Sequence, residues 1–133
     1  MPFEKKLIPF AATHSFSDLV LDYLNDDEKL KPFYNYTLSV EGLKQAIANR
    51  KSKQVNRTVL FEVIEKQYAA INEKSALLKT NIELLKSENT YTVTTGHQLN
   101  IFTGPLYFIY KIFSAINLAE QLKKHFPEDN FVP

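Results

Sequence analysis

The chain has 133 residues, of which 44% are hydrophobic and 23% are charged, and its formal net charge is +1. This composition is typical of a soluble globular protein, and a nearly neutral chain has no overall field that would favour nucleic acid or an anionic membrane. Because the sequence has no cysteine, no signal-peptide pattern and no apolar run of roughly 20 residues, it excludes disulfides, thiolate metal sites and a membrane span, and we expect a cytoplasmic protein.

The N-terminal part of the chain is predicted to be mainly helical. Residues 7–10 could form a short edge strand, because proline is tolerated only at the edge or end of a strand. Ser15 and Ser17 are suitable N-caps for a first helix, residues 31–35 form a connection, and Ser39 is expected to cap a second helix. The side chains expected to face inward are Leu19, Val20, Tyr23 and Leu24 in the first helix and Leu43, Ala46 and Ile47 in the second.

The middle of the chain carries apolar pairs at intervals of seven residues, which indicates helix. Polar residues interrupt this stripe where a strict coiled coil would place apolar ones. We therefore predict two helices, 57–71 and 75–87, that bend near residues 71–75; one long helix is the alternative. The pairs are Val63-Ile64, Ala70-Ile71, Leu77-Leu78 and Leu84-Leu85, and the interrupting residues are Gln67, Lys74 and Asn81.

The C-terminal part is predicted to be a β-α-β unit, with strands 91–95 and 130–133 and a helix over 105–125. Two strands joined in this way pair in parallel through a right-handed crossover. Parallel sheets need more than two strands to be stable, so this sheet is expected to be incomplete and the chain to be the N-terminal part of a longer one. The predicted fold class is therefore α/β, with a mainly helical region over 1–89 and the β-α-β unit over 90–133.

The loop over residues 96–105 is the most informative segment, because it joins a strand to a helix N-terminus, where free amides favour an anion. Gly96 permits a tight exit from the strand and a close approach of the backbone to a ligand. Thr103 or Gly104 could cap the helix, and Pro105 suits its first position. Side-chain donors are supplied by His97, Gln98, Asn100 and Lys111, and the hydroxyls of Tyr107 and Tyr110 could also reach the site.

This loop matches neither a Walker motif nor a Gly-x-Gly-x-x-Gly fingerprint, so ordinary glycine and proline punctuation is the alternative interpretation. His97 has no partner carboxylate in the segment, so a loop histidine bonded to backbone is the preferred interpretation over a general acid or a phosphate donor. The acids at Asp18, Asp22 and Asp26 are interpreted as a solvated helix face, and the basic cluster over residues 50–57 as a connection between helices. No metal site is predicted.

The motifs Thr94-Thr95-Gly96-His97-Gln98, Phe102-Thr103-Gly104-Pro105-Leu106-Tyr107 and Tyr110-Lys111 resemble the bacillithiol biosynthesis cysteine-adding enzyme family (BshC), the cysteine ligases. The resemblance runs across the whole chain, but only residues 91–111 are specific to it. It implies a Rossmann-like core, a coiled-coil region that supports a homodimer, and addition of cysteine to glucosaminyl malate in bacillithiol synthesis. It also implies ATP as cofactor, and contacts to nucleotide or substrate from Gly96, His97, Gln98, Thr103, Gly104 and Lys111.

Under this resemblance the catalytic residues are unidentified, and the 133-residue chain alone is expected to be inactive. Two other functions stay open. The chain could be a helical interaction module that binds a partner helix through the stripe over 63–85, or a regulatory domain that binds a nucleotide or anion without chemistry. Self-association without any nucleotide effect would favour the module.

Overall fold

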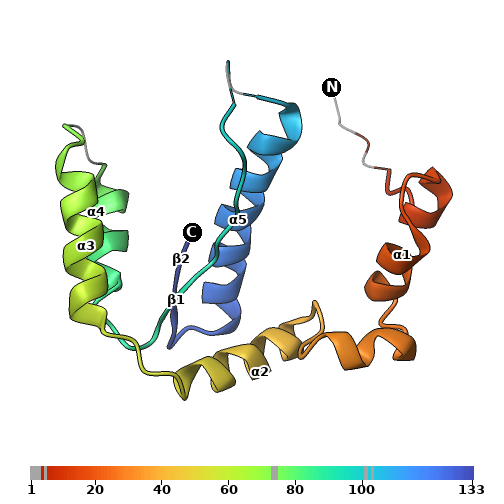
Figure 1. The fold of residues 1–133 in the computed structure, drawn as a ribbon, viewed down its shortest axis with the longest axis horizontal. Coiled ribbons are helices and arrows are strands. Elements are labelled where there is room, and N and C mark those ends of the chain that lie inside the picture. The colour runs from red at the N-terminus through yellow and green to blue at the C-terminus, as the bar shows by residue number, and fades with distance from the viewer. Residues whose placement is uncertain (1–3, 5, 73–74, 101, 103) are drawn as a thin grey trace. The chain divides into compact units, whose positions relative to one another are not determined.

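A computed structural model describes residues 4, 6–72, 75–100, 102 and 104–133, and the chain divides into two compact units, one ending at Ala48 and the other covering Asn49–Pro133. The first unit contains a 3-10 helix η1 (Phe10–Thr13), helix α1 (Asp18–Leu24), a 3-10 helix η2 (Glu28–Phe33) and most of helix α2 (Val40–Lys51). The second contains α3 (Arg57–Ala69), α4 (Ala76–Leu84), strand β1 (Thr90–Thr92), α5 (Leu106–His125) and strand β2 (Asn130–Val132) (Figure 1).

The edge strand predicted over residues 7–10 is wrong. Residues 6–9 have no regular structure, and Phe10 begins η1. Pro9 is extended, with φ −58° and ψ 141°, but the first unit has no strand among its described residues with which it could pair. An isolated extended segment gains no ladder hydrogen bonds, so the local preference for extended backbone does not produce a strand.

The predicted helix starts are confirmed. Ser17 occupies the N-cap of α1, although its side chain makes no capping bond, and the Ser39 Oγ accepts a hydrogen bond of 3.0 Å from the Gly42 amide at the start of α2. The connection predicted over 31–35 begins later than expected, because η2 continues to Phe33 after its N-cap Asp27 accepts a bond from the Lys29 amide.

Three of the four residues predicted to face inward in α1 are exposed instead. Leu19 is 64% exposed, Val20 and Leu24 are also exposed, and Tyr23 is half-buried. Helix α1 has only seven residues, so it offers little surface for packing, and three of its side chains line an open hollow of about 650 Å³. The hollow is lined by Leu19, Val20, Tyr23, Leu30, Phe33 and Tyr34.

Tyr34 gives the first unit a pH dependence. Its hydroxyl donates a hydrogen bond to an Asp26 carboxylate oxygen, and this bond, with the carboxylate charge, raises the pKa of Tyr34 to about 12 from 10.0. The interaction is therefore present below pH 10 and is lost as the pH rises through about 12. We expect an ultraviolet difference titration of the wild type against Tyr34→Phe to show this late ionisation.

Asp26→Asn is the matched variant, because Asp26 has a φ of 57° and asparagine tolerates that left-handed backbone. This variant is expected to return the pKa of Tyr34 towards 10. A Tyr34 ionisation that is unchanged in Asp26→Asn would show that the carboxylate is not its cause.

The helices α3 and α4 form an antiparallel hairpin, so two helices are confirmed and the single long helix is excluded (Figure 1). Each begins at a side-chain cap: Asn56 accepts from the Val59 amide and Ser75 from the Leu78 amide, both at 3.1 Å. Both helices end two or three residues earlier than predicted. Among the described residues of the apolar stripe only Leu85 is buried, next to Ile82, which is buried on the same helix end but lies outside the stripe.

The β-α-β unit is confirmed, with β1 and β2 paired in parallel in an open two-stranded sheet. The register places Thr90 opposite Asn130 and Thr92 opposite Val132. The strand predicted over 91–95 starts one residue earlier than expected, at Thr90, and ends at Thr92. It ends early because β2 provides pairing partners only as far as Val132. The last bond of the ladder joins the Val93 amide to the Val132 carbonyl at 2.9 Å.

The core of the second unit lies where α4 and α5 meet β2. Thr90 is 1% exposed, and its hydroxyl donates to the Leu84 carbonyl at 2.5 Å while its own carbonyl accepts from Arg57 at 2.9 Å. Asp129 is buried and pairs with Lys51 at 3.2 Å. Arg57 and Lys51, which belong to the basic cluster over residues 50–57, thus have structural partners. The buried apolar residues are Ile82, Leu85, Ala119, Leu122 and Val132.

None of the helices in the described ranges combines the length and the hydropathy that a membrane crossing requires.

Candidate functional site

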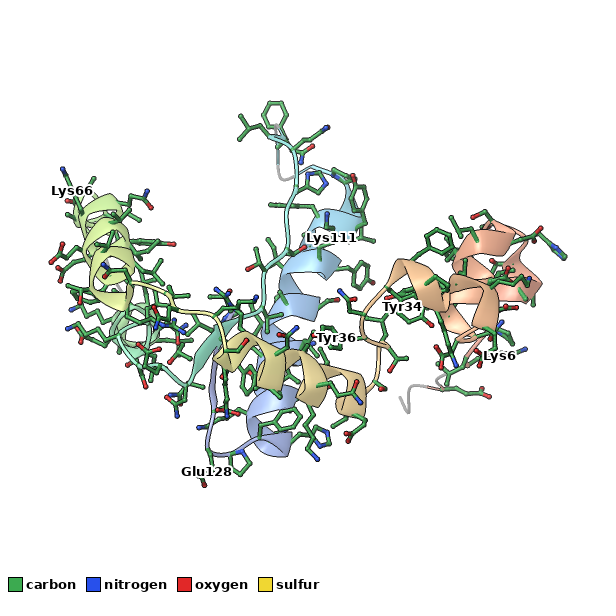
Figure 2. All side chains as sticks on the ribbon, turned by 60° about the horizontal axis from the view of Figure 1, so that its bottom comes forward. Lys6, Tyr34, Tyr36, Lys66, Lys111 and Glu128 are labelled. Carbon is green, nitrogen blue, oxygen red and sulfur yellow. The ribbon has the colours of Figure 1, made fainter. Side chains whose placement is uncertain are left out.

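The chain that leaves β1 runs back along α5 towards the N-terminus of that helix (Figure 1). Lys111, in the second turn of α5, donates a hydrogen bond from its Nζ to the carbonyl of Gly96. Figure 2 shows this side chain reaching from the helix towards the returning chain. The structure therefore brings together Gly96 and Lys111, two of the residues that the sequence selects, which are 15 positions apart along the chain.

The two glycines of the loop differ in what the backbone requires of them. Gly104 has a φ of +66°, and a Cβ placed there would lie 2.7 Å from the Asn100 Cγ, so a larger residue would be both strained and crowded. A Cβ at Gly96 would meet no atom within 4 Å. The tight exit predicted at Gly96 is therefore not required by the fold, whereas its contact with a ligand stays a prediction.

His97 is held by neighbours within the loop and on α5. Its ring centroid lies 5.0 Å from those of Tyr107 and Phe108. Its Nδ1 lies 2.7 Å from the Gln98 carbonyl and 2.7 Å from the Asn100 Nδ2. The Nε2 is buried and has no hydrogen-bond partner among the residues that the structure describes. A buried polar atom without a partner costs roughly 1–3 kcal/mol, which a bound ligand could offset.

The start of α5 differs by one residue from the prediction. Pro105, with φ −72° and ψ 154°, is the N-cap, and Leu106 is the first helical residue. Gly104 is therefore not the cap, and Thr103 lies outside the described residues. Proline fits both positions, because neither N-cap nor N1 uses its amide within the helix. The Pro105 carbonyl accepts from the Phe108 amide at 2.9 Å.

A hollow of about 340 Å³ lies between the returning chain and α5. Its surface is mainly apolar, and the described residues that line it include five with hydroxyl groups and one lysine but none with a carboxylate. Such a set of donors suits phosphate or carboxylate oxygens. The lining residues are Val93, Thr94, Thr95, Tyr107, Tyr110, Lys111, Ser114, Ala115 and Leu118.

Tyr107, Tyr110 and Lys111, which the sequence selects as site residues, line this hollow, and so does Ser114, which the sequence did not indicate. Ser114 follows Lys111 by three residues and Tyr110 by four, so it belongs to the same face of α5. That helical spacing was the signal that could have identified it. Gln98, by contrast, contributes its backbone carbonyl to the loop, and its side chain is not among the groups that line the hollow.

Comparisons with known proteins agree on one family. A family model described as "Bacillithiol biosynthesis BshC, N-terminal Rossmann-like domain" matches residues 3–133. A Flavobacterium psychrophilum protein named "Putative cysteine ligase BshC" is 47% identical over 129 residues, covering 95% of this chain and 24% of that protein. Proteins of the same name are 41% identical over 133 residues in Cytophaga hutchinsonii (98% and 25%) and 32% identical over 103 residues in Bacillus cytotoxicus (77% and 19%).

The chain thus spans about a quarter of the length of the first of these relatives. No solved structure matches it.

Proposed function

The chain belongs to the bacillithiol biosynthesis BshC family, and from this membership we propose that it works as the N-terminal part of a cysteine ligase. The reaction would join cysteine to glucosaminyl malate through an amide bond. The observation that carries the proposal is the hollow beside α5, where Thr94, Thr95, Tyr107 and Tyr110 of the specific motifs lie around Lys111, which is bonded to Gly96. We place the reaction in the cytoplasm.

We further propose that ATP drives this ligation. An amide does not form readily from a free carboxylate and an amine, and ATP would supply the activation of that carboxylate. Although the hollow is mainly apolar, Lys111 and five hydroxyl-bearing residues among the described lining residues could donate to a phosphate-bearing ligand, and none of these lining residues is acidic. Lys111 can neutralise phosphate charge while it keeps its bond to Gly96, since an ammonium has three donors.

The loop would orient the ligand. The left-handed turn at Gly104 and the Lys111 bond fix the two ends of the segment, so that the groups between them are positioned before a ligand binds. A preorganised loop stabilises developing charge without rearrangement during the reaction. Other parts of the native protein would supply the remaining catalytic groups.

The test is a ligation assay on the native protein that carries this sequence, with cysteine, glucosaminyl malate and ATP. Product formation that depends on ATP would support the proposal. Product formation without any nucleotide would show that ATP is not the cofactor. Lys111→Met is expected to weaken ATP binding roughly 10- to 100-fold, because a charged hydrogen bond contributes about 1.5–3 kcal/mol. Isothermal titration calorimetry measures this change.

Lys124→Met is the matched control for this substitution. Lys124 is exposed in the last turn of the same helix and is absent from the lining of the hollow. It should bind ATP as the wild type does. Equal binding by Lys111→Met and Lys124→Met would remove Lys111 from the site.

A second candidate function is a helical interaction module, because the α3–α4 hairpin exposes apolar side chains that include Val59, Val63 and Leu77. In the ligase this same surface would serve a homodimer. Sedimentation of the native protein at several concentrations, with and without ATP, measures self-association and distinguishes the interaction module from the ligase. Self-association combined with no binding of ATP or substrates would favour the module alone.

A further inference from the structure

The hollow of about 650 Å³ in the first unit has walls that are almost entirely apolar, and it shares no residue with the candidate site. Its lining comes from α1, from η2 and from Tyr34, so we call it the α1–η2 hollow. Two of its side chains, Leu19 and Phe33, are 64% and 84% exposed. A concave apolar surface that is open to water is typical of a place where another segment or protein binds.

Two tyrosine rings fix one wall of the α1–η2 hollow. The rings of Tyr23 and Tyr34 pack edge to face, with their centroids 5.2 Å apart. The Tyr34 hydroxyl is also bonded to the Asp26 carboxylate, and Figure 2 labels this tyrosine. Side chains that are already held in this way lose little further freedom when a partner binds. The hollow is therefore preformed.

The first unit has no apolar core of its own. Among its described residues, which extend to Ala48, Gly42 is the one that is buried. Folding has to bury apolar surface to offset the loss of conformational entropy, and a unit as short as this has little surface to bury internally. The apolar surface that stabilises the unit is therefore buried against something outside it.

The lengths of the relatives indicate a source for the covering surface. The relatives named above match this chain over a quarter of their length or less, so about three quarters or more of each has no counterpart in it. A second copy of the chain suits the hollow less well. A two-fold interface brings the same surface of both copies together, and two facing hollows would leave a void that close-packed proteins avoid.

The segment that forms the hollow is acidic. Residues 18–34 contain five carboxylates and two lysines, which gives them a net charge of −3. Both lysines already have partners within the segment, Lys29 with Asp22 at 3.4 Å and Lys31 with Glu28. Opposite charges favour the correct partner of a surface, so a segment with lysine or arginine beside its apolar side chains suits this one. The carboxylates are Asp18, Asp22, Asp26, Asp27 and Glu28.

We propose that the α1–η2 hollow is the docking site for an apolar segment, flanked by lysine or arginine, from the remaining part of the native protein. By the remaining part we mean the part that corresponds to the unmatched three quarters of the relatives. The apolar side chains of the segment fill the hollow, and its basic residues face the acids of α1 and η2. The proposal rests on family membership and not on the ligation reaction, so it can fail while the proposed function stands, and the reverse.

The first test locates the occupant by photo-cross-linking. A photoreactive phenylalanine analogue replaces Phe33 in the native protein, and mass spectrometry identifies the peptide that is attached after irradiation. We expect a peptide from the remaining part, with apolar residues next to lysine or arginine, in a product that keeps the mass of a single chain. The same analogue at Lys44, which is exposed in α2 and absent from the lining, should not capture that peptide.

Three results would overturn the proposal. A peptide from residues 49–133 would show that the second unit of this chain covers the hollow. A product of twice the mass would show that a second copy covers it. The absence of any attached peptide would show that the hollow faces water.

The second test measures stability. In the native protein, Phe33→Ala is expected to lower the urea midpoint of unfolding by about 1 M, because removing a covered phenylalanine ring leaves a cavity. Lys44→Ala is the matched control and should keep the wild-type midpoint. A nearly neutral Phe33→Ala would mean that the ring is not covered, which would refute the docking site. If Phe33→Ala does not fold, the cross-link decides, because the photoreactive analogue retains the aromatic ring.

Discussion

Replacing Leu122 with alanine is expected to lower the free energy of unfolding of the second unit by about 2–5 kcal/mol. Leu122 is 5% exposed and lies on the face of α5 that packs against β2. The unit has few other fully buried apolar side chains among its described residues, so little surrounding core is available to close the cavity. Because small domains are stable by only about 5–15 kcal/mol, this single change could remove much of the total.

Leu118→Ala is the matched control, since it deletes the same atoms one turn earlier on the same helix at a position that is 38% exposed. The Leu118→Ala substitution should lower the free energy of unfolding clearly less than Leu122→Ala does, because part of the Leu118 side chain remains in water when the chain is folded. Urea unfolding followed by circular dichroism gives both values. Equal losses for the two variants would mean that α5 does not pack against the sheet through Leu122.

Gly104→Ala is expected to reduce ATP affinity at least about tenfold, while leaving the core of the second unit folded. A left-handed backbone costs a residue with a Cβ roughly 1–2 kcal/mol, and here the Cβ would also collide with the Asn100 side chain. The loop would have to move, and the groups it positions would move with it. Calorimetric titration with ATP measures the loss, and unfolding in urea confirms that the fold is retained.

Gly96→Ala is the structural control for this effect, because the added Cβ has open space around it. Amide NMR shifts over residues 97–100 should change in Gly104→Ala and stay close to the wild type in Gly96→Ala. Similar shift changes in both variants, or wild-type ATP binding by Gly104→Ala, would contradict the role assigned to the turn.

Local signals predicted much of the fold. Ser17 and Ser39 precede their helices, and the interval between the two short strands leaves room for the crossover helix that pairs them in parallel. The α/β class and the Rossmann-like family followed from these features and from the motifs of the loop. The failures concern segments whose state depends on distant partners. Residues 7–10 lacked a strand to pair with, and Leu19 lacked a surface to cover it.

The site was predictable in its residues but not in its geometry. Glycine at position 104 indicated a backbone conformation that other residues rarely adopt. Lys111 indicated a positive charge on the helix that follows the loop. The contacts of His97 with Gln98 and Asn100 could not be derived, because they depend on the path of the loop that precedes Gly104. The same holds for Arg57, which the sequence placed in a connection and which the structure bonds to the Thr90 carbonyl, 33 residues away.

The parallel pairing of β1 with β2 has a consequence for the order in which the unit folds. The hairpin of α3 and α4 and the turns of α5 form from contacts between near neighbours, whereas Thr90 meets Asn130 only after about forty residues have been brought into a closed loop. Closing such a loop has an entropic cost of about 3 kcal/mol, and two three-residue strands return few hydrogen bonds for it. We therefore expect strand pairing to be the late, slow event, with helix α5 favouring it because the formed helix shortens the distance between the strands.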